Sequence, residues 1–318
     1  MLILSHKDIA ALDIDPVKCY EWADEMLRAK DRVILPAKTS IKPSEEIFYN
    51  VMPSILPENN TAGVKVVTRY PERTPSLDSQ IMTFDLETGR IKAFMDGNYI
   101  TTMRTGAVAA HSVKLLAVRE FYRIGLIGLG NQARAVVKVI ASIFPGRRLE
   151  MKLFVYKDQH ILFENFVRGL PGTENYTFIY SYTYDDTIRG SDVVISSVTY
   201  FASDICENDC FDEGCLLVPI HTRGFMNCDL FFDKIFADDT AHVKGFKYFD
   251  RFREFSEVTD VLSGRHPGRT SDKERLIAYN IGLSMHDVYF AEMIYKIAAE
   301  KGIGSEAELC PPVEKFWI

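Results

Sequence analysis

A short apolar run at residues 124–127 is followed by two glycines and then by apolar residues at helical spacing. This pattern predicts a buried strand, a tight turn at Gly128 and Gly130, and an amphipathic helix. Glycine lets the backbone come close to a ligand, and the first N–H groups of a helix attract anions. The stretch therefore predicts a strand–turn–helix unit that binds the pyrophosphate of a dinucleotide.

Gly128, Gly130 and Ala133 match the fingerprint G-x-G-x-x-G/A, in which the last small residue lets the helix pack on the strand. Such a match also occurs in unrelated strand–turn–helix units, so the flanking segments matter. Residues 151–156 form a second apolar run, and residues 191–197 have the β-branched character of a parallel strand buried on both faces. The three segments together favour a nicotinamide dinucleotide as cofactor.

Asp158 follows the second of these strands, where an acidic residue would bond to the adenosine ribose hydroxyls. Its spacing from the glycine turn is longer than usual, and Lys157 lies beside it. The acidic residue favours NAD, as does the lack of an arginine pair just after this strand. NADP stays open as the alternative cofactor.

Strand and helix patterns alternate over residues 118–270, as they do in a doubly wound domain. Segments between residues 47 and 95 instead alternate apolar and polar residues and are separated by turn signals, which predicts an antiparallel sheet. Helical patterns are expected at residues 15–30, 102–116 and 285–299.

The expected fold class is therefore α/β: a Rossmann-type doubly wound parallel sheet plus an N-terminal α+β substrate-binding and dimerisation domain. The predicted division gives residues 1–117 and 275–318 to the substrate-binding and dimerisation domain and residues 118–274 to the dinucleotide-binding domain. Substrate is expected in the cleft between the domains, beyond the carboxyl ends of the parallel strands.

Composition limits the classes of partner. Of the 318 residues, 47% are hydrophobic and 25% are charged, which is typical of a soluble globular protein. A net charge of −7 argues against a general nucleic-acid surface. Because no apolar run approaches the roughly 18 residues of a membrane span and no signal-peptide pattern is present, we expect a cytoplasmic protein that binds neither membrane nor nucleic acid.

Three of the six cysteines, Cys206, Cys210 and Cys215, lie close in the sequence to His221. A zinc site is one interpretation, but the spacing matches no established ligand pattern. Reduced, mostly buried thiols are the favoured interpretation, and no metal is expected.

Lys65 shares its face of a predicted strand with Gly63 and Val67, which are small or apolar. It is either a solvated surface lysine or a lysine in a partly desolvated cleft, where it acts as an acid, a base or a carboxylate partner.

Arg104 begins a helical stretch of small apolar residues, so it is expected to be buried and to need an anion. Its guanidinium would bind a substrate carboxylate through two parallel hydrogen bonds or, alternatively, form a structural ion pair with an acid such as Asp96.

Asp229 follows the apolar strand at residues 216–220 and its loop. Loops at the ends of parallel strands line the active cleft, so this acid would exchange protons with substrate. The structural alternative is an N-cap for the segment that follows.

Taken together, these stretches resemble the ornithine cyclodeaminase/mu-crystallin family over nearly the whole chain. The resemblance rests on their order and spacing rather than on any one motif. The matching stretches are residues 52–53, 63–67, 101–107, 127–133, 191–194, 227–229 and 281–287.

The resemblance implies a homodimer whose N-terminal sheets close into one barrel, a Rossmann domain on each subunit, and chemistry at the α-carbon of an amino or imino acid. It assigns Lys65 and Arg104 to the motif lysine and the carboxylate-binding arginine, and Asp229 to the catalytic acid. Lys38 stands where the family usually has a further arginine for the carboxylate.

The resemblance also implies the dinucleotide contacts. They are Gly128, Gly130, Asn131, Gln132 and, less closely matched, Asp158, with Thr199 near the nicotinamide half. These residues keep the family pattern better than those around the substrate.

Departures from the family pattern at Lys38, in the loop 221–229, and at Asn280 and His286 surround the expected substrate pocket. They favour an NAD(P)-dependent amino-acid dehydrogenase or imine reductase. Three alternatives stay open: a cyclodeaminase-type lyase that recycles NAD internally, an opine-type or amino-acid-conjugating dehydrogenase, and a non-catalytic binding protein like mu-crystallin.

Overall fold

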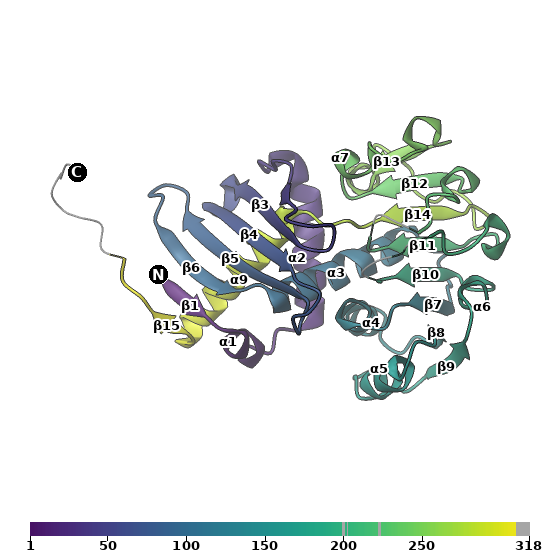
Figure 1. The fold of residues 1–318 in the computed structure, drawn as a ribbon, viewed down its shortest axis with the longest axis horizontal. Coiled ribbons are helices and arrows are strands. Elements are labelled where there is room, and N and C mark those ends of the chain that lie inside the picture. The colour runs from purple at the N-terminus through teal and green to yellow at the C-terminus, as the bar shows by residue number, and fades with distance from the viewer. Residues whose placement is uncertain (199–200, 202, 222–223, 310–318) are drawn as a thin grey trace. The chain divides into compact units, whose positions relative to one another are not determined.

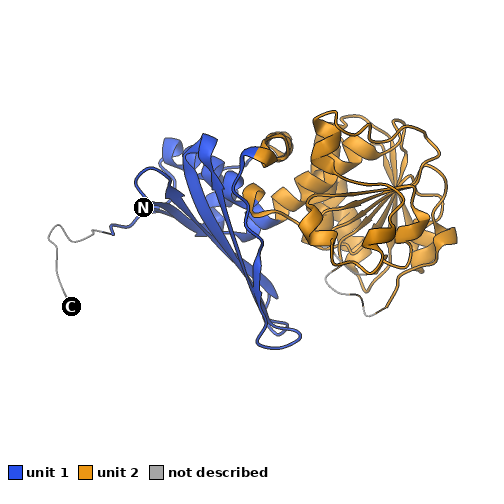
Figure 2. Ribbon diagram, turned by 90° about the horizontal axis from the view of Figure 1, so that it is seen from above, with its two compact units in different colours: residues 1–14, 32–101, 287–318 blue, residues 15–31, 102–286 orange. Residues whose placement is uncertain are grey.

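The computed structural model describes residues 1–198, 201, 203–221 and 224–309. It divides into two compact units: unit 1 contains residues 1–14, 32–101 and 287–318, and unit 2 contains residues 15–31 and 102–286 (Figure 2). Two helices, α3 (Asn98–Leu116) and α9 (Ser284–Lys301), contribute residues to both units. Across the described residues, no helix is long and apolar enough to span a bilayer.

Unit 2 contains an eight-stranded sheet in the order β13-β12-β14-β11-β10-β7-β8-β9 (Figure 1). Every neighbouring pair in it is parallel. The strands are β7 (Arg123–Ile127), β8 (Leu149–Phe154), β9 (Tyr176–Ser181), β10 (Val193–Ser196), β11 (Leu216–Pro219), β12 (Lys234–Ala237), β13 (Phe255–Glu257) and β14 (Leu276–Tyr279). The chain runs outward from β7 through β8 to β9 and then returns to β10 on the other side of β7. The predicted doubly wound parallel sheet is confirmed.

Helices connect successive strands of this sheet: α4 (Asn131–Ile143), α5 (Gln159–Arg168), α6 (Tyr184–Ile188), α7 (Thr240–Val243) and α8 (Val258–Leu262). Helix α2 (Pro16–Ala29) contacts α4 and α8, and α3 leads into β7. Helix α4 buries Ala133, Val136 and Ile140 because they recur at helical spacing. Helix α3 crosses α4 closely, since a Cβ on Gly106 would lie 2.6 Å from the Ala135 Cβ.

Unit 1 contains a seven-stranded sheet in the order β15-β1-β6-β5-β4-β3-β2. The elements of this unit besides α9 are β1 (Leu2–Leu4), α1 (His6–Ala11), β2 (Thr39–Ile41), β3 (Phe48–Leu56), β4 (Thr61–Arg69), β5 (Leu77–Asp85), β6 (Ile91–Asp96) and β15 (Ser305–Glu306). Strands β2 to β6 are antiparallel, as predicted. Outside the segments for which an antiparallel sheet was predicted, β1 lies between β15 and β6 and pairs in parallel with β6. A chain segment far from β6 in sequence is free of the hairpin constraint that makes neighbouring strands antiparallel.

The two faces of the unit 1 sheet differ. Gly63 and Lys65 of β4 are buried on the face that packs against α9. The alternate residues point to the opposite face, where Val64, Met82 and Phe94 pair across β4, β5 and β6. These three side chains are only partly buried, and Phe94 is 37% exposed. Unit 1 therefore has one covered face and one apolar, partly exposed face.

Candidate active site

The glycine turn after β7 lies at the position where the order of the unit 2 sheet reverses. Gly128 has φ +85, which favours glycine, and a Cβ there would come within 2.9 Å of the Val198 Cγ1. The Ser197 hydroxyl, just after β10, donates to the Gly128 carbonyl at 2.8 Å. The loops after β7 and β10 are thus tied together at the switch point, where ligands of doubly wound sheets bind.

The N-terminus of α4 is shaped to accept an anionic group. Gly130 is the N-cap residue, and a Cβ added to it would meet no atom within 4 Å. Gln132 in the first turn has a buried Oε1 that lacks a hydrogen-bond partner within the described part of the chain. Asn131 beside it is exposed. Open space and the N–H groups at the start of a helix fit a pyrophosphate.

Asp158 is the N-cap residue of α5, yet its side chain makes no capping hydrogen bond. It is exposed, and Lys157 before it has φ +50, a left-handed conformation that turns the chain after β8. The carboxylate is therefore not used to cap the helix. Thr199, predicted near the nicotinamide half, lies outside the described residues.

Lys65 is not the solvated surface lysine that its strand pattern also allowed. Its side chain is 1% exposed, and its Nζ lies 2.6 Å from the Oδ2 of Asp287, which is 0% exposed. A buried ammonium of this kind needs a carboxylate, because desolvation strongly disfavours an isolated charge. Asp287, in the first turn of α9, was not among the predicted site residues.

The approach of β4 to α9 depends on Gly63. A Cβ on this residue would lie 2.8 Å from both Cγ atoms of Val288, which is too close for real carbon atoms. Gly63 and Lys65 lie on one face of β4, and Val288 follows Asp287 along α9. The small residue two positions before the lysine therefore lets the ion pair form.

Arg104 is buried in α3, with 6% of its surface exposed. Its guanidinium lies against the backbone of Gly282, where a Cβ would come within 2.4 Å of the Arg104 Nη1. Gly282 has φ +102, so its missing side chain is required by both conformation and space. The Gly282 N–H donates to the buried Asp238 Oδ2 at 2.5 Å. The connection from β14 to α9 thus forms a wall beside the guanidinium.

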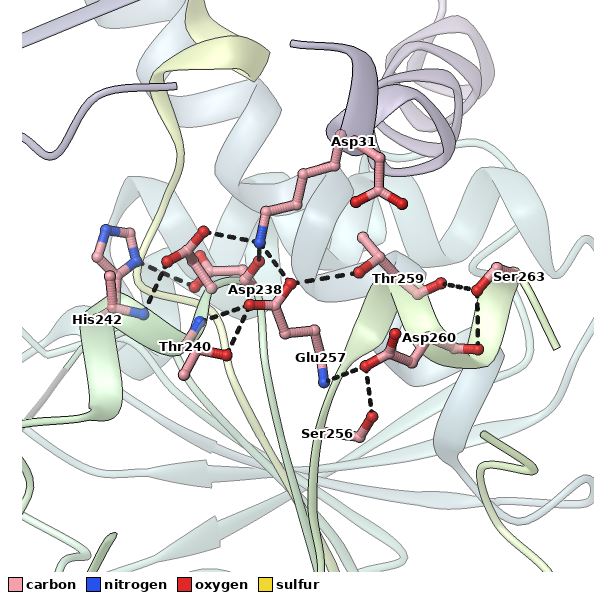
Figure 3. A network of polar contacts seen from close by, with 12 residues as sticks. Asp31, Asp238, Thr240, His242, Ser256, Glu257, Thr259, Asp260 and Ser263 are labelled. Carbon is pink, nitrogen blue, oxygen red and sulfur yellow. Dashed lines mark hydrogen bonds and ion pairs between the residues drawn. The ribbon is translucent and has the colours of Figure 1, made fainter. Parts of the chain in front are cut away.

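Asp238 belongs to a polar network at the carboxyl ends of β12 and β13 (Figure 3). The Lys30 ammonium donates to the Asp238 carbonyl at 2.8 Å and to the Glu257 Oε2 at 2.6 Å, and lies 2.7 Å from the Asp239 Oδ2. The other oxygen of Glu257 accepts from the N–H and hydroxyl of Thr240. This network fixes the segment that carries Asp238, and through it Gly282.

Asp229 begins a short 3-10 turn, Asp229–Phe231, and is 0% exposed. Its Oδ1 accepts a hydrogen bond from the Tyr279 hydroxyl at 2.6 Å. Its Oδ2 is buried with no hydrogen-bond partner among the described residues. Burial raises the pKa of this carboxyl to about 7, and the bond from Tyr279 opposes that rise. The group is therefore placed to hold or release a proton near neutral pH.

His221 and the cysteines near it in sequence do not have the arrangement of a zinc site. The His221 Nε2 lies 2.7 Å from the Ser196 hydroxyl, and its ring packs on Phe201 and Phe225. Cys206, Cys210 and Cys215 are free and buried. Over the described residues no cluster of three or more metal-ligating side chains occurs.

The predicted residues divide between the units. Unit 1 carries Lys65 and also Lys38, which is exposed one residue before β2. Unit 2 carries Arg104, Asp229 and the described dinucleotide contacts. Within unit 2, Asp229 and Arg104 both contact the end of β14 and its connection, through Tyr279 and Gly282. Tyr279 was not predicted as a site residue, because the pattern of an apolar strand does not show which group its last side chain contacts.

Comparisons with known proteins agree on one family. The model of the ornithine cyclodeaminase/mu-crystallin family matches residues 18–302. The nodulation efficiency protein NfeD of Rhizobium meliloti is 27% identical over 95% of this chain and 97% of its own length. A Δ1-pyrroline-2-carboxylate reductase of Bacillus cereus is 25% identical over 87% of this chain and 90% of its own length.

A solved structure has the same fold. The Δ1-pyrroline-2-carboxylate reductase of Thermococcus litoralis, in complex with NADH and L-proline, superposes with a TM-score of 0.84. It is 23% identical and covers 96% of this chain and all of its own.

Proposed function

The chain belongs to the ornithine cyclodeaminase/mu-crystallin family, and from this premise we propose that it is an NAD(P)-dependent imine reductase or amino-acid dehydrogenase. The chemistry that a bound nicotinamide supplies is hydride transfer to or from the substrate α-carbon. The observation that carries the proposal is Asp229, a buried acid in the unit that also holds the glycine turn. One of its oxygens has no hydrogen-bond partner among the described residues. A protein that only bound its ligand would have no use for such an acid.

The cationic residues would bind the substrate. Arg104 would hold the substrate carboxylate in a bidentate arrangement, with Lys65 and Lys38 as further cationic contacts. The wall at Gly282 restricts where the guanidinium lies, which supports a fixed position for the carboxylate. Fixing one end of a small substrate also fixes its α-carbon, and such positioning supplies several kcal/mol of barrier reduction.

Proton transfer falls to Asp229. In the reducing direction its neutral carboxyl gives a proton to the substrate nitrogen as the α-carbon gains hydride, and in the oxidising direction its carboxylate takes that proton back. A pKa of about 7 suits both directions, since each protonation state is populated near neutral pH.

Cofactor binding falls to the glycine turn. Gly128, Gly130, Asn131 and Gln132 would surround the pyrophosphate at the start of α4. The exposed carboxylate of Asp158 would accept hydrogen bonds from the adenosine ribose hydroxyls, which favours NAD over NADP.

A homodimer is part of the proposal. The stripe of Val64, Met82 and Phe94 on the face of the unit 1 sheet away from α9 is apolar and partly exposed. Apolar sheet faces of this kind are covered in stable proteins, and a second copy would cover it with the same surface. The dimeric barrel implied for the family has this arrangement.

The cysteines bear on where the enzyme works. The five cysteines in the described part of the chain are all free and buried. Because secreted proteins tend to pair their cysteines, these thiols support placement in the cytoplasm.

The test is the change in reduced-nicotinamide absorbance with a panel of cyclic imines, including Δ1-pyrroline-2-carboxylate, and of L-amino acids. We expect NADH consumption with an imino carboxylate. Asp229→Asn should lower kcat by about 10²- to 10⁴-fold while the Kd for NADH, measured by fluorescence, stays unchanged. Release of ammonia from L-ornithine without net cofactor turnover would instead identify a cyclodeaminase. Absence of turnover with every carboxylate-bearing substrate would overturn both.

A further inference from the structure

The phenol of Tyr279 and the carboxyl of Asp229 form a buried, hydrogen-bonded pair inside unit 2. Tyr279 ends β14 and is 2% exposed, and its hydroxyl lies 2.6 Å from the Asp229 Oδ1. Phe246 packs edge-on against the tyrosine ring with centroids 5.0 Å apart. Tyr279 also belongs to a buried cluster that includes Phe232 and Ile277. Packing therefore holds the ring in place while its hydroxyl donates to Asp229.

The hydrogen bond makes the two carboxyl oxygens unequal. Burial raises the pKa of Tyr279 well above its usual value, so the phenol stays protonated and acts as the donor. Its bond occupies Oδ1 in both charge states of Asp229. A proton on the neutral carboxyl then resides on Oδ2, the oxygen without a partner among the described residues.

We propose that Tyr279 is a positioning residue for catalysis, fixing Asp229 so that Oδ2 carries the proton exchanged with the substrate nitrogen. This inference rests on the proposed function. In imine reduction the α-carbon gains the hydride that reduced nicotinamide would supply on being oxidised, and the C=N π pair moves to nitrogen. The O–H bond at Oδ2 breaks as its proton forms the N–H bond. Asp229 is left as a carboxylate whose Oδ1 still accepts from Tyr279. Amino-acid oxidation is the reverse of this step.

The same hydrogen bond tunes proton affinity, because a donor to a carboxylate stabilises its charged form. Within the described residues, the groups that act on the pair are few: Tyr279 acts on Asp229, while Asp229 and the adjacent thiol of Cys228 act on Tyr279. Loss of the phenolic hydroxyl should therefore raise the pKa of Asp229 further above about 7. A hydrogen bond contributes about 1 kcal/mol net, and a contribution of that size to one protonation state shifts a pKa by about one unit.

The experiment compares Tyr279→Phe with Tyr176→Phe. Tyr176 is a matched control because it is also a buried tyrosine of unit 2, and its hydroxyl has no partner in the described part of the chain. The first readout is infrared titration of the protonated carboxyl, assigned by its loss in Asp229→Asn. We expect the midpoint to rise by roughly one pH unit in Tyr279→Phe and to stay unchanged in the control.

The second readout is the pH dependence of turnover. Reduction needs the neutral acid, so its decline at high pH should move upward by the same amount in Tyr279→Phe. The infrared titration needs no substrate. Absence of turnover would therefore refute the proposed function, and the midpoint alone would then test the effect of Tyr279 on Asp229.

A further measurement covers the case in which Tyr279→Phe does not fold. Biosynthetic replacement of tyrosine by 3-fluorotyrosine makes the phenol a stronger donor and should lower the Asp229 midpoint. An unchanged midpoint in both Tyr279→Phe and the fluorinated protein, or a shift of equal size in Tyr176→Phe, would overturn the positioning role.

Discussion

The ammonium of Lys65 lies 2.6 Å from the carboxylate of Asp287, and neither side chain has more than 1% of its surface exposed. A pair this deeply buried contributes little net stability when intact, because desolvation offsets the attraction. Removing one partner is a different matter, since the charge of the other stays in the core of unit 1 without this contact.

We therefore expect Lys65→Met to lower the free energy of unfolding by about 3–5 kcal/mol. Lys296→Met is the control, because Lys296 is 48% exposed and its buried partner Glu292 keeps the Lys92 ammonium at 2.6 Å. Its loss should cost at most about 1 kcal/mol. Urea unfolding monitored by circular dichroism measures both. Equal losses in the two variants would contradict this view of the buried pair.

Gly282→Ala should weaken substrate binding through Arg104. The added Cβ would lie 2.4 Å from the Arg104 Nη1 and must displace the guanidinium, so KM should rise about tenfold or more while NADH affinity is kept. Gly264→Ala is the matched control, since Gly264 also has positive φ but has no atom within 4 Å of its Cβ position. Both variants share the backbone strain of alanine at positive φ. A rise in KM confined to Gly282→Ala in steady-state kinetics would therefore come from displacement of the guanidinium.

The raised pKa of Asp229 also predicts a pH dependence of stability. Burial favours the neutral acid in the folded state, with a pKa of about 7 against 3.8 when unfolded, so between these values the folded chain binds more protons. Stability from this group is full below pH 4, falls as pH rises to about 7, and is flat above. The free energy of unfolding of wild type relative to Asp229→Asn should thus decline by on the order of 4 kcal/mol over that window. A difference that stays constant with pH would refute it.

The apolar stripe on unit 1 leads to a prediction about assembly. Met82→Lys places a charge in the middle of the stripe between Val64 and Phe94, and should convert the proposed dimer into a monomer. Leu162→Lys is the control, because Leu162 is 57% exposed on α5 in the other unit. Sedimentation velocity gives the mass of each variant, and a dimeric Met82→Lys protein would argue against this interface.

Much of the architecture was predictable from the sequence because its signals are local. The glycine turn, the continuous apolar strands and the small-residue helix of Arg104 each depend on a few adjacent residues, and the structure has all three. Burial of Lys65 was one of two interpretations, since alternation along a strand does not say whether a face is covered. That answer depends on α9, which packs on β4 from the other end of the chain.

The partners of the functional side chains were not predictable. Asp287 and Tyr279 meet Lys65 and Asp229 only through pairings between segments distant in sequence. A carboxyl followed by an apolar segment predicts an N-cap as readily as an acid. Desolvation of the carboxyl decides between these interpretations. It depends on how β14 and its aromatic neighbours pack, which a local sequence pattern does not show.

The short segment from Tyr279 to Gly282 has a consequence for engineering. Because one end of β14 supports both Asp229, the proposed proton donor, and the Arg104 guanidinium, we expect substitutions there to alter turnover and affinity together. Libraries that seek a new substrate side chain should hold these four positions constant and diversify elsewhere, whereas a search for an altered pH optimum should begin at Tyr279 alone.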